Sequence, residues 1–352
     1  MGKRDKSRQV LTSKAVKGQD TPDLEEEVGV TTFSQSKIKA WRKCRAYYDY
    51  LVNQNLEPRK PPRPFLFGTI VHEVLEKGKA GMLDVLQNYA DEMGELFIEE
   101  QEYYGDILND IHDIMTEYFI RYGKDEYEIY RADKIDFVEM QIVVPIGQGV
   151  IFKGRIDKVV TKKNRRYLVE HKTFKRLPDE NHRWRDIQTA IYSTALANYG
   201  HPIDGILWNY ICSKPPTMPK LNKDGSISNR PIVTLPTTVR RFAKNSGIKV
   251  PEKLMDQAQE SIDRYFHRFL YPSNPRVNSL VLRDFLDTAN EIKEFSHDST
   301  TMTIAQHCSF CQYEPICRAK LGGLDETFII KKQFKVGDRF ADQTAKVDDS
   351  ED

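Results

Sequence analysis

The chain has 352 residues, enough for one large domain or two modest ones, and its 53 basic and 52 acidic side chains leave a net charge of +1. This balance excludes a strong overall attraction to polyanions, so a nucleic-acid-binding role needs positive charge that is gathered locally. No apolar run is long enough to span a membrane, and the opening MGKRDKSRQV lacks a hydrophobic signal core. We therefore expect a soluble, intracellular protein without membrane contacts.

The first part of the chain is predicted to be mainly helical. Residues 1–30 are basic and then acidic, with too few apolar residues to pack, so we expect a disordered arm. Residues 31–135 form a predicted N-terminal helical region, in which Ser34 is a suitable cap for the first amphipathic helix. The proline-rich segment EPRKPPRPF separates this helix from the next one, which carries His72.

Residues 136–212 are predicted to form a mixed α/β core. Three strand-like segments are followed by an amphipathic helix that begins at Arg183 and ends near Gly200, and a further strand completes the core. The predicted strands are 136–146, 150–160, 166–171 and 205–212.

The last part of the chain divides into three regions. Residues 213–300 are expected to form a long loop, rich in Pro and Lys, and then a helical extension. Residues 301–325 contain three closely spaced cysteines. Residues 326–352 form the tail, which is expected to be mostly disordered from about residue 334.

Charged residues stand at the ends of neighbouring predicted strands. Side chains alternate along a strand, so Glu170 and Lys172 are expected on one face and His171 on the other. Carboxylate oxygens of Asp157 and Glu170, together with the backbone carbonyl of His171, would suit Mg²⁺ or Mn²⁺. A lysine beside such an ion can orient or help deprotonate the attacking water, or stabilise charge on a phosphate oxygen. The alternative is an ordinary exposed pair of charges.

The other candidate residues also have ordinary interpretations. Asp157 could form a turn, and His72 could be a hydrogen-bonded residue at the edge of the core. As a ligand, the imidazole of His72 would suit manganese better than magnesium. Gln188 and Tyr192 lie on one helix face, four residues apart, and could merely pack. The order in which these residues occur together favours a functional site.

This ordered set of motifs resembles the PD-(D/E)XK nuclease superfamily. The family pattern corresponds here to G-x-x-x-H from Gly68 to His72, G-x-x-D from Gly154 to Asp157, E-x-K at Glu170 and Lys172, and Q-x-x-x-Y at Gln188 and Tyr192. The last motif marks the RecB-type branch, which includes CRISPR-associated adaptation nucleases and phage recombination exonucleases. The resemblance covers about residues 31–325, and one departure is a glutamate at position 170, where aspartate is commoner.

The resemblance implies a restriction-endonuclease-like fold, with a mixed central sheet flanked by helices and extended by further helical regions. It implies a Mg²⁺- or Mn²⁺-dependent deoxyribonuclease, most simply an exonuclease that acts at DNA ends in recombination, repair or phage DNA processing. A structure-selective endonuclease and an inactive DNA- or partner-binding scaffold are the alternatives. The implied catalytic residues are Asp157, Glu170, Lys172, Gln188 and Tyr192, and the implied metal ligands are His72, Asp157, Glu170 and the His171 carbonyl.

The five cysteines indicate a metal site rather than a disulfide framework. Cys308, Cys311 and Cys317 have the spacing C-x2-C-x5-C, which suits zinc or an iron–sulfur cluster once a fourth thiolate is added. The family resemblance implies a [4Fe-4S] cluster with Cys44 as the fourth ligand, which would join the N- and C-terminal parts of the domain. Cys212 ends an apolar strand and is expected to be a small buried residue.

Local basic segments provide candidate contacts with DNA, the implied partner. They contain interspersed aromatic residues that could stack on bases, including Trp41, Tyr47, Trp184 and Phe242. The segments are KIKAWRKCR, RKPPRP, KRLPDENHRWR and TVRRFAKNSGIK. The sequence contains no G-x-x-x-x-G-K-[ST] phosphate loop, so a separate helicase or recombination protein would have to supply any unwinding. If the protein is phage-encoded, it would act in the host cytoplasm.

Overall fold

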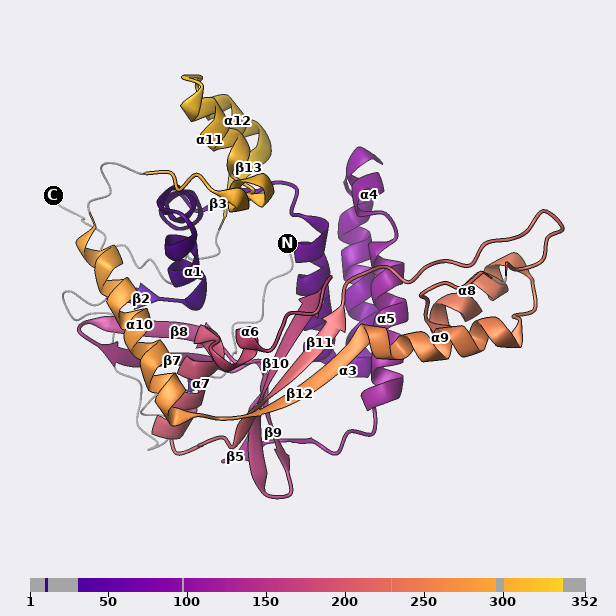
Figure 1. Cartoon of the computed structure of the whole chain (residues 1–352), viewed down its shortest axis with the longest axis horizontal. Helices are drawn as coiled ribbons and strands as arrows, with labels where there is room; N and C mark the ends of the chain where they lie inside the picture. The colour runs from indigo at the N-terminus through magenta and orange to yellow at the C-terminus, as the bar shows by residue number, and fades with distance from the viewer. Residues whose placement is uncertain (1–9, 12–30, 97, 229, 296–300, 338–352) are drawn as a thin grey trace.

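Two mixed β-sheets lie at the centre of the protein, and helices pack around them (Figure 1). The computed structural model describes residues 10–11, 31–96, 98–228, 230–295 and 301–337. The predicted mixed α/β class is confirmed, but the central strands form two sheets instead of one. Among the described residues, no helix combines the length and the apolar character needed to cross a membrane.

The larger sheet carries Glu170 and Lys172. Its strand order is β12 (Phe266–Pro272), β11 (Gly205–Cys212), β10 (Arg165–Phe174), β9 (Lys158–Lys162) and β4 (Glu128–Ile129). Strand β10 pairs in parallel with β11, so that Lys172 lies opposite Tyr210, and pairs antiparallel with β9. Every residue of β11 is buried, as expected for a central apolar strand that is covered on both faces.

The smaller sheet contributes the strand that ends two residues before Asp157. Its strand order is β1 (Val10–Leu11), β7 (Gln141–Gly147), β8 (Val150–Arg155) and β2 (Thr31–Phe33). The predicted continuous strand 150–160 is therefore wrong, because the chain leaves one sheet at Arg155 and enters the other at Lys158. The backbone carbonyl of Asp157 instead accepts a hydrogen bond from the backbone N–H of Glu139, at 2.8 Å.

Helices cover these sheets and extend beyond them. The predicted cap is confirmed, because the Ser34 side chain accepts a hydrogen bond from the backbone N–H of Lys37 at the start of the first helix. The helices before the sheets are α1 (Gln35–Lys43), α2 (Arg45–Tyr48), a π-helical turn (Asp49–Asn53), α3 (Arg63–Gly94), α4 (Ile98–Tyr104) and α5 (Ile107–Tyr122). The later ones are α6 (Asn181–Trp184), α7 (Ile187–Asn198), α8 (Pro236–Ser246), α9 (Glu252–Tyr265) and α10 (Pro275–Glu294). A small hairpin of β5 (Arg131–Ala132) and β6 (Ile135–Asp136) precedes β7.

Two predicted regions differ from the structure. The helical extension is interrupted by strand β12, which pairs antiparallel with β11 and completes the edge of the larger sheet. The start of the part predicted to be disordered is also structured: α12 (Thr327–Gln333) leads into β13 (Phe334–Val336), which pairs with β3 (Leu56–Pro58). Strand β1 falls within the predicted arm, and the rest of that arm lies outside the described residues.

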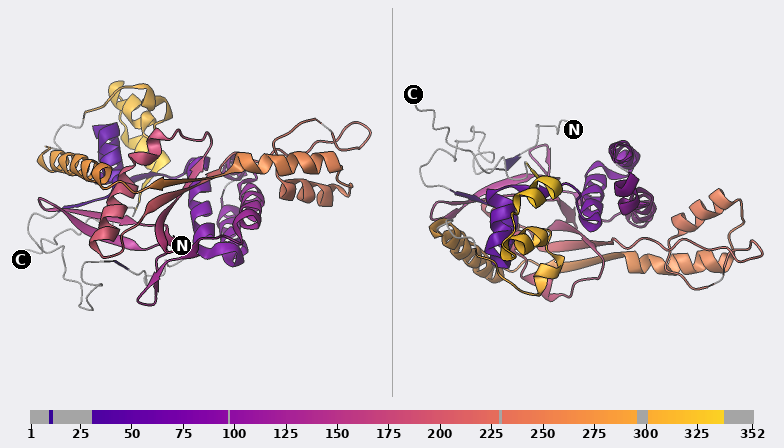
Figure 2. Two further views of the ribbon diagram at one scale, coloured as in Figure 1. Left: turned by 60° about the horizontal axis from the view of Figure 1, so that its bottom comes forward. Right: turned by 90° about the horizontal axis from the view of Figure 1, so that it is seen from above.

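Residues 301–337 form a C-terminal module that packs against an early part of the chain. It contains a 3-10 turn (Gln306–Phe310), α11 (Glu314–Leu321), α12 and β13, and it lies beside α1 in both views of Figure 2. The Tyr313 hydroxyl donates a hydrogen bond of 2.7 Å to the backbone carbonyl of Leu56, and the Tyr313 ring stacks on the buried Phe334 ring. Buried aromatic packing therefore explains why this part of the predicted tail is ordered.

Candidate active site

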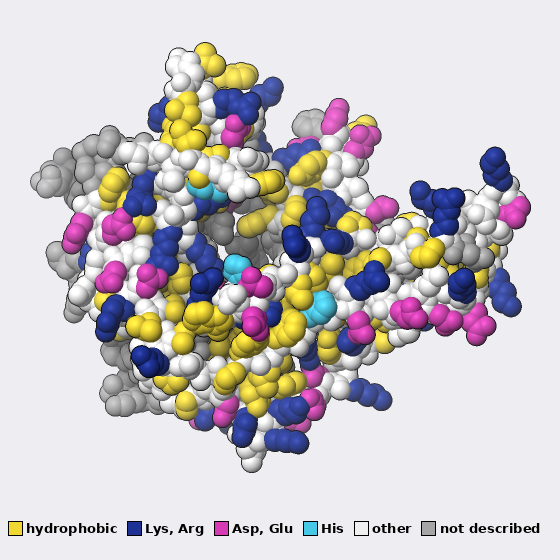
Figure 3. Space-filling view, viewed as in Figure 1, with side chains coloured by type: hydrophobic (Ala, Val, Ile, Leu, Met, Phe, Trp, Pro, Cys, Tyr) yellow, Lys and Arg dark blue, Asp and Glu magenta, His cyan; other side chains and the backbone are white. Residues whose placement is uncertain are grey.

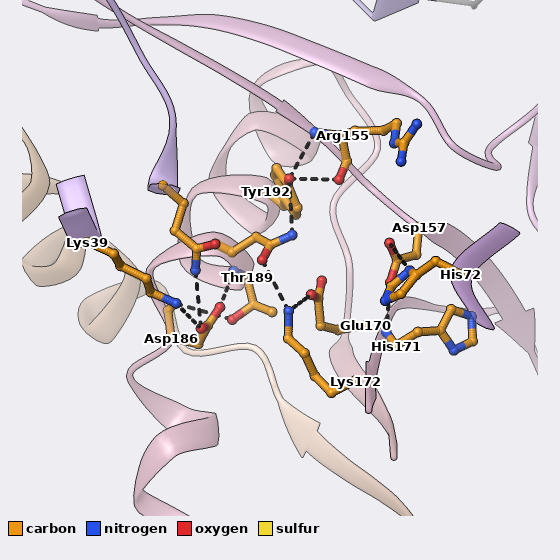
Figure 4. Close-up of polar contacts among 12 residues, drawn as sticks. Lys39, His72, Arg155, Asp157, Glu170, His171, Lys172, Asp186, Thr189 and Tyr192 are labelled. Atoms are coloured by element: carbon orange, nitrogen blue, oxygen red, sulfur yellow. Dashed lines mark hydrogen bonds and ion pairs between the residues drawn. The ribbon is translucent and has the colours of Figure 1, made fainter. Parts of the chain in front are cut away.

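Asp157 lies at the junction of the two sheets, and its side chain points toward the end of β10. The Oδ2 atom accepts a hydrogen bond of 2.7 Å from the backbone N–H of His171, while Oδ1 lies 3.7 Å from Nδ1 of His72 on α3 (Figure 4). Burial raises the pKa of Asp157, although the N–H of His171 and the charge of Lys172 oppose this change. The site therefore holds a buried carboxyl group whose lost hydration is only partly replaced by the His171 hydrogen bond and the charge of Lys172.

Glu170 and Lys172 lie side by side on β10, as the strand alternation predicts. Glu170 is 1% exposed; its Oε1 pairs with the Lys172 ammonium, and its Oε2 has no hydrogen-bond partner among the described residues. Burial is the main reason that the pKa of Glu170 is raised to about 7. The positive charge of Lys172 acts to lower this pKa, and the negative charge of Asp157 acts to raise it. Burial acts to lower the pKa of Lys172, but Glu170 and Asp186 outweigh it and raise that pKa, so the ammonium stays charged.

Gln188 and Tyr192 connect helix α7 to both sheets. Lys172 Nζ donates to Gln188 Oε1 at 3.3 Å, and Gln188 Nε2 donates to the Tyr192 hydroxyl, also at 3.3 Å. That hydroxyl donates to the Arg155 carbonyl at 2.7 Å and accepts from the Arg155 N–H at 2.9 Å. Tyr192 thus fixes the backbone two residues before Asp157, while Gln188 holds Lys172, so the pair does more than pack.

Two glycines allow these elements to approach closely. A Cβ atom on Gly154 would lie 2.7 Å from the Phe152 ring and 2.8 Å from the Tyr192 hydroxyl, so no other residue fits without movement. A Cβ on Gly68 would lie 3.3 Å from Thr173 Oγ1, where α3 crosses the end of β10. The first residue of each glycine-containing motif therefore lets the last residue, Asp157 or His72, reach the site.

The two histidines occupy different environments. The His72 side chain is 34% exposed and lies on the open side of the site, where burial and then Lys172 lower its pKa. His171 is buried on the opposite face of β10, with its Nδ1 atom 2.7 Å from the Asn209 amide nitrogen. The His171 side chain therefore lies on the face of β10 opposite Glu170 and Lys172, as the strand alternation predicts, and the backbone N–H of His171 contacts Asp157.

Sequence reasoning did not identify Asp186, which lies directly before α7. Its carboxylate caps that helix by accepting from the Thr189 N–H at 3.0 Å, and it lies 3.7 Å from Lys39 Nζ and 3.5 Å from Gln35 Nε2. Asp186 and Lys39 also line a cavity of about 410 Å³ that extends from this corner of the site. An aspartate immediately before a helix is a recognisable cap signal, but the predicted helix began earlier, at Arg183.

The carboxylates of Asp157 and Glu170 are ligands of the type that suits a hard divalent cation. Among the residues that the structure describes, no three His, Cys, Asp or Glu side chains are arranged as a ready metal site. The unpartnered Oε2 of Glu170 is a buried carboxylate oxygen that lacks a positive partner, beside the desolvated carboxyl of Asp157. Carboxylate oxygens of this kind are ligands that Mg²⁺ and Mn²⁺ accept, so the residues fit such an ion.

Four cysteines gather where α1 and α2 meet the C-terminal module. The Thr303 N–H donates to Cys44 Sγ at 3.3 Å, and Cys308 Sγ lies 3.7 Å from the Thr303 carbonyl. Burial raises the pKa of Cys317 to about 11, and the nearby Cys311, Cys44 and Cys308 add to the effect. Among the described residues, these thiols are not arranged as a ready metal site.

Cys212 is placed apart from these four. It is buried at the end of β11 on the larger sheet, and burial raises its pKa.

The chain matches one protein family and is distantly similar to several solved structures. Residues 32–318 match the family described as the PD-(D/E)XK nuclease superfamily. No curated protein matches the chain. The crystal structure of SSO0001 is 15% identical, with 84% of this chain and 92% of that chain covered at a TM-score of 0.31. The crystal structure of a "Putative exonuclease" from Eubacterium rectale is also 15% identical, with 84% and 99% covered at a TM-score of 0.39.

Proposed function

This chain belongs to the PD-(D/E)XK nuclease superfamily, and from that premise we propose that it is a metal-dependent deoxyribonuclease with Asp157, Glu170 and Lys172 at its centre. We propose further that it is a RecB-type exonuclease that removes nucleotides from DNA ends. Recombination, repair or phage DNA processing would then be its setting, with a separate helicase or recombination protein as a partner.

One observation carries the assignment of the site. Glu170 is an almost fully buried carboxylate with one oxygen paired to Lys172 and the other without a partner. Leaving a buried charge half-satisfied destabilises the protein, and burial accordingly raises the pKa of Glu170 to about 7. Such an arrangement is expected where a cation completes the set, and perturbed carboxyl groups of this kind cluster at functional sites.

Asp157, Glu170 and the backbone carbonyl of His171 would hold the Mg²⁺ or Mn²⁺, with His72 as a further ligand from the open side. The bound ion would supply charge neutralisation at the scissile phosphate and a water that is more nucleophilic at neutral pH. Because its pKa is raised, Lys172 is a poor proton acceptor, and its ammonium instead stabilises negative charge on a phosphate oxygen. Gln188 orients that ammonium, and Tyr192 fixes the backbone that leads to Asp157.

The choice between exonuclease and endonuclease is tested with topologically defined DNA. End-labelled linear duplex and covalently closed circular duplex are incubated with the protein in Mg²⁺, in Mn²⁺ and in EDTA. An exonuclease releases nucleotides from the linear duplex in either metal and leaves the circle intact. Cleavage of the circle would instead identify an endonuclease, and binding without cleavage of either DNA would identify an inactive scaffold.

We also propose that Cys44, Cys308, Cys311 and Cys317 hold a [4Fe-4S] cluster. Support comes from the contacts of Cys44 and Cys308 with the backbone of Thr303, from the proximity of the other thiols to Cys317, and from the segregation of Cys212. A cluster at this position would tie α1 to the C-terminal module and act mainly as a structural link.

Metal analysis of anaerobically purified protein tests the cluster. The wild type and the matched control Cys212→Ser should carry about four irons per chain, and Cys44→Ser should lose them. Stoichiometric zinc in place of iron would replace the cluster with a zinc site. Loss of iron in Cys212→Ser but not in Cys44→Ser would refute the ligand assignment.

A further inference from the structure

An arm of the structure, defined here as residues 213–228 and 230–265, projects from the edge of the sheet that holds Glu170 and Lys172. It contains the loop after β11 together with α8 and α9, and it extends away from the body in Figures 1 and 2. Strands β10 and β11 are parallel, and Cys212 is opposite Phe174, two residues beyond Lys172. The arm therefore begins within about two residues, roughly 7 Å along the strand, of the proposed catalytic edge.

Positive charge is concentrated on this arm. Residues 213–249 contain eight lysines and arginines and a single acid, Asp224, so this segment carries +7 in a chain whose net charge is +1. The remainder of the chain therefore carries −6. Figure 3 shows Lys and Arg side chains on the tip and the upper side of the arm, and a row of Asp and Glu side chains along its lower edge. The exposed acids on α9 are Glu252, Asp256, Glu260 and Asp263.

The exposed cations of the arm are available for a ligand. Lys220, Lys223 and Lys244 are exposed and form no ion pair with any residue that the structure describes. The tip that carries two of them is ordered, because the Asn222 N–H bonds to the Ser226 carbonyl at 2.8 Å. The nearby Ile227 side chain is buried in a small core with α8 and α9.

A buried polar cluster fixes the arm to the body. Asp113 on α5 is fully buried, and it receives hydrogen bonds from Arg241 at 2.8 Å and from Thr238 at 2.8 Å. One turn further along α5, Glu117 accepts from both the backbone and the side chain of Thr237. Helix α8 is thus held by partners that would be costly to separate, so its cations keep a defined position relative to the catalytic edge.

We propose that the α8–α9 arm binds the sugar–phosphate backbone of double-stranded DNA, at base pairs that lie beyond the bond that is cleaved. This inference rests on the proposed nuclease function and adds a second binding surface to it. The phosphate backbone of DNA is the partner that fits the exposed lysines that this basic segment leaves unpaired among the described residues, and the acidic edge of α9 would orient the duplex toward the opposite side. Phe242 is the sole aromatic residue in 213–249, and it packs into the core of the arm. Contacts with phosphates are therefore favoured over base stacking, which indicates a duplex rather than a single strand.

The span of the arm sets the length of DNA that it reaches. Helix α9 has 14 residues and is about 21 Å long, which corresponds to about six base pairs of duplex. A DNA molecule that extends well past the cleaved bond should therefore bind more tightly than one that ends at the site.

Binding in EDTA tests the arm independently of cleavage. A fluorescent 30-bp duplex is titrated with the wild type, with Lys220→Gln/Lys223→Gln/Lys244→Gln, and with the control Lys134→Gln/Lys163→Gln/Arg165→Gln. The control removes three exposed cations, from the turn between β5 and β6 and the turn between β9 and β10, where β10 begins. The arm variant should bind the duplex about tenfold more weakly and lower the slope of log Kd against log salt by about 2 to 3, whereas the control should stay near the wild type.

Equal affinities for the two variants would overturn the proposal, and so would a loss confined to a single-stranded 30-mer. If the arm variant binds the duplex as tightly as the wild type, the partner of the arm would instead be an acidic protein surface. If the wild type binds duplex through the arm but cleaves no DNA in Mg²⁺ or Mn²⁺, the proposed nuclease function fails while the arm inference stands. Circular dichroism of all three proteins establishes that each is folded.

Discussion

Replacing Glu170 with glutamine should remove a pH-dependent loss of stability from the metal-free protein. Burial is the chief reason that the pKa of Glu170 rises from 4.5 to about 7. A carboxyl group whose pKa is raised on folding stabilises the fold in its protonated form, below its unfolded pKa. That contribution is lost as the pH rises through 7. At about 1.4 kcal/mol per pKa unit, the loss between pH 5 and pH 8 is about 2 to 3 kcal/mol.

Urea unfolding of the wild type and Glu170→Gln in EDTA, at intervals between pH 5 and pH 8, measures this effect. Groups that titrate in both proteins cancel in the difference, and Lys172 stays charged throughout because its pKa is raised. The variant should gain about 2 to 3 kcal/mol relative to the wild type across this range.

Mg²⁺ should change the free energy of unfolding in the opposite sense and favour the wild type over Glu170→Gln. It should stabilise the wild type more at pH 8 than at pH 6, because ionised carboxylates bind the cation, and it should affect Glu170→Gln much less. Parallel pH profiles for the two proteins, with or without Mg²⁺, would refute the interpretation of Glu170 as a buried carboxylate that awaits a cation.

Three further predictions concern the surroundings of this carboxylate. Asp157→Ala and Lys172→Ala should each abolish DNA cleavage, a loss of several kcal/mol of transition-state stabilisation, with an unchanged far-UV circular dichroism spectrum; substantial residual activity in either variant would remove that residue from the centre. His72→Ala should weaken cleavage in Mg²⁺ and change the Mg²⁺/Mn²⁺ activity ratio, and an unchanged ratio and rate would exclude His72 as a ligand. Gly154→Ala should lower the free energy of unfolding by about 1 to 3 kcal/mol, because the added Cβ meets the Tyr192 hydroxyl; urea unfolding identical to the wild type would show that the contact relaxes freely.

The relative directions of the candidate site residues could be predicted from the sequence, because short-range rules determine them. Strand alternation correctly places Glu170 and Lys172 on one face of β10 and His171 on the other. Helical spacing places Gln188 and Tyr192 on one face of α7, where both contact the site. These relations hold within a single element, so they do not depend on how the elements pack.

Features that depend on long-range packing were not predictable in the same way. The chain leaves the strand before Asp157, where the Asp157 carboxylate accepts a hydrogen bond from the backbone N–H of His171 in β10. His171 lies 14 positions later in the chain. Strand β12 forms because β11 has an edge to be paired, and its own sequence, FHRFLYP, does not distinguish an edge strand from a helix end. Asp186 joins the site only because α1 brings Lys39 beside the start of α7.

Cleavage of linear duplex DNA in Mg²⁺ by the wild type and by Glu170→Gln, purified and assayed side by side, is the most direct test of the proposed active site. The wild type should release nucleotides in a reaction that EDTA stops, while Glu170→Gln should be inactive although it is folded and still binds the duplex. Equal rates for the two proteins, or no hydrolysis by the wild type in either Mg²⁺ or Mn²⁺, would contradict the assignment of Glu170 as a metal-binding residue of a nuclease.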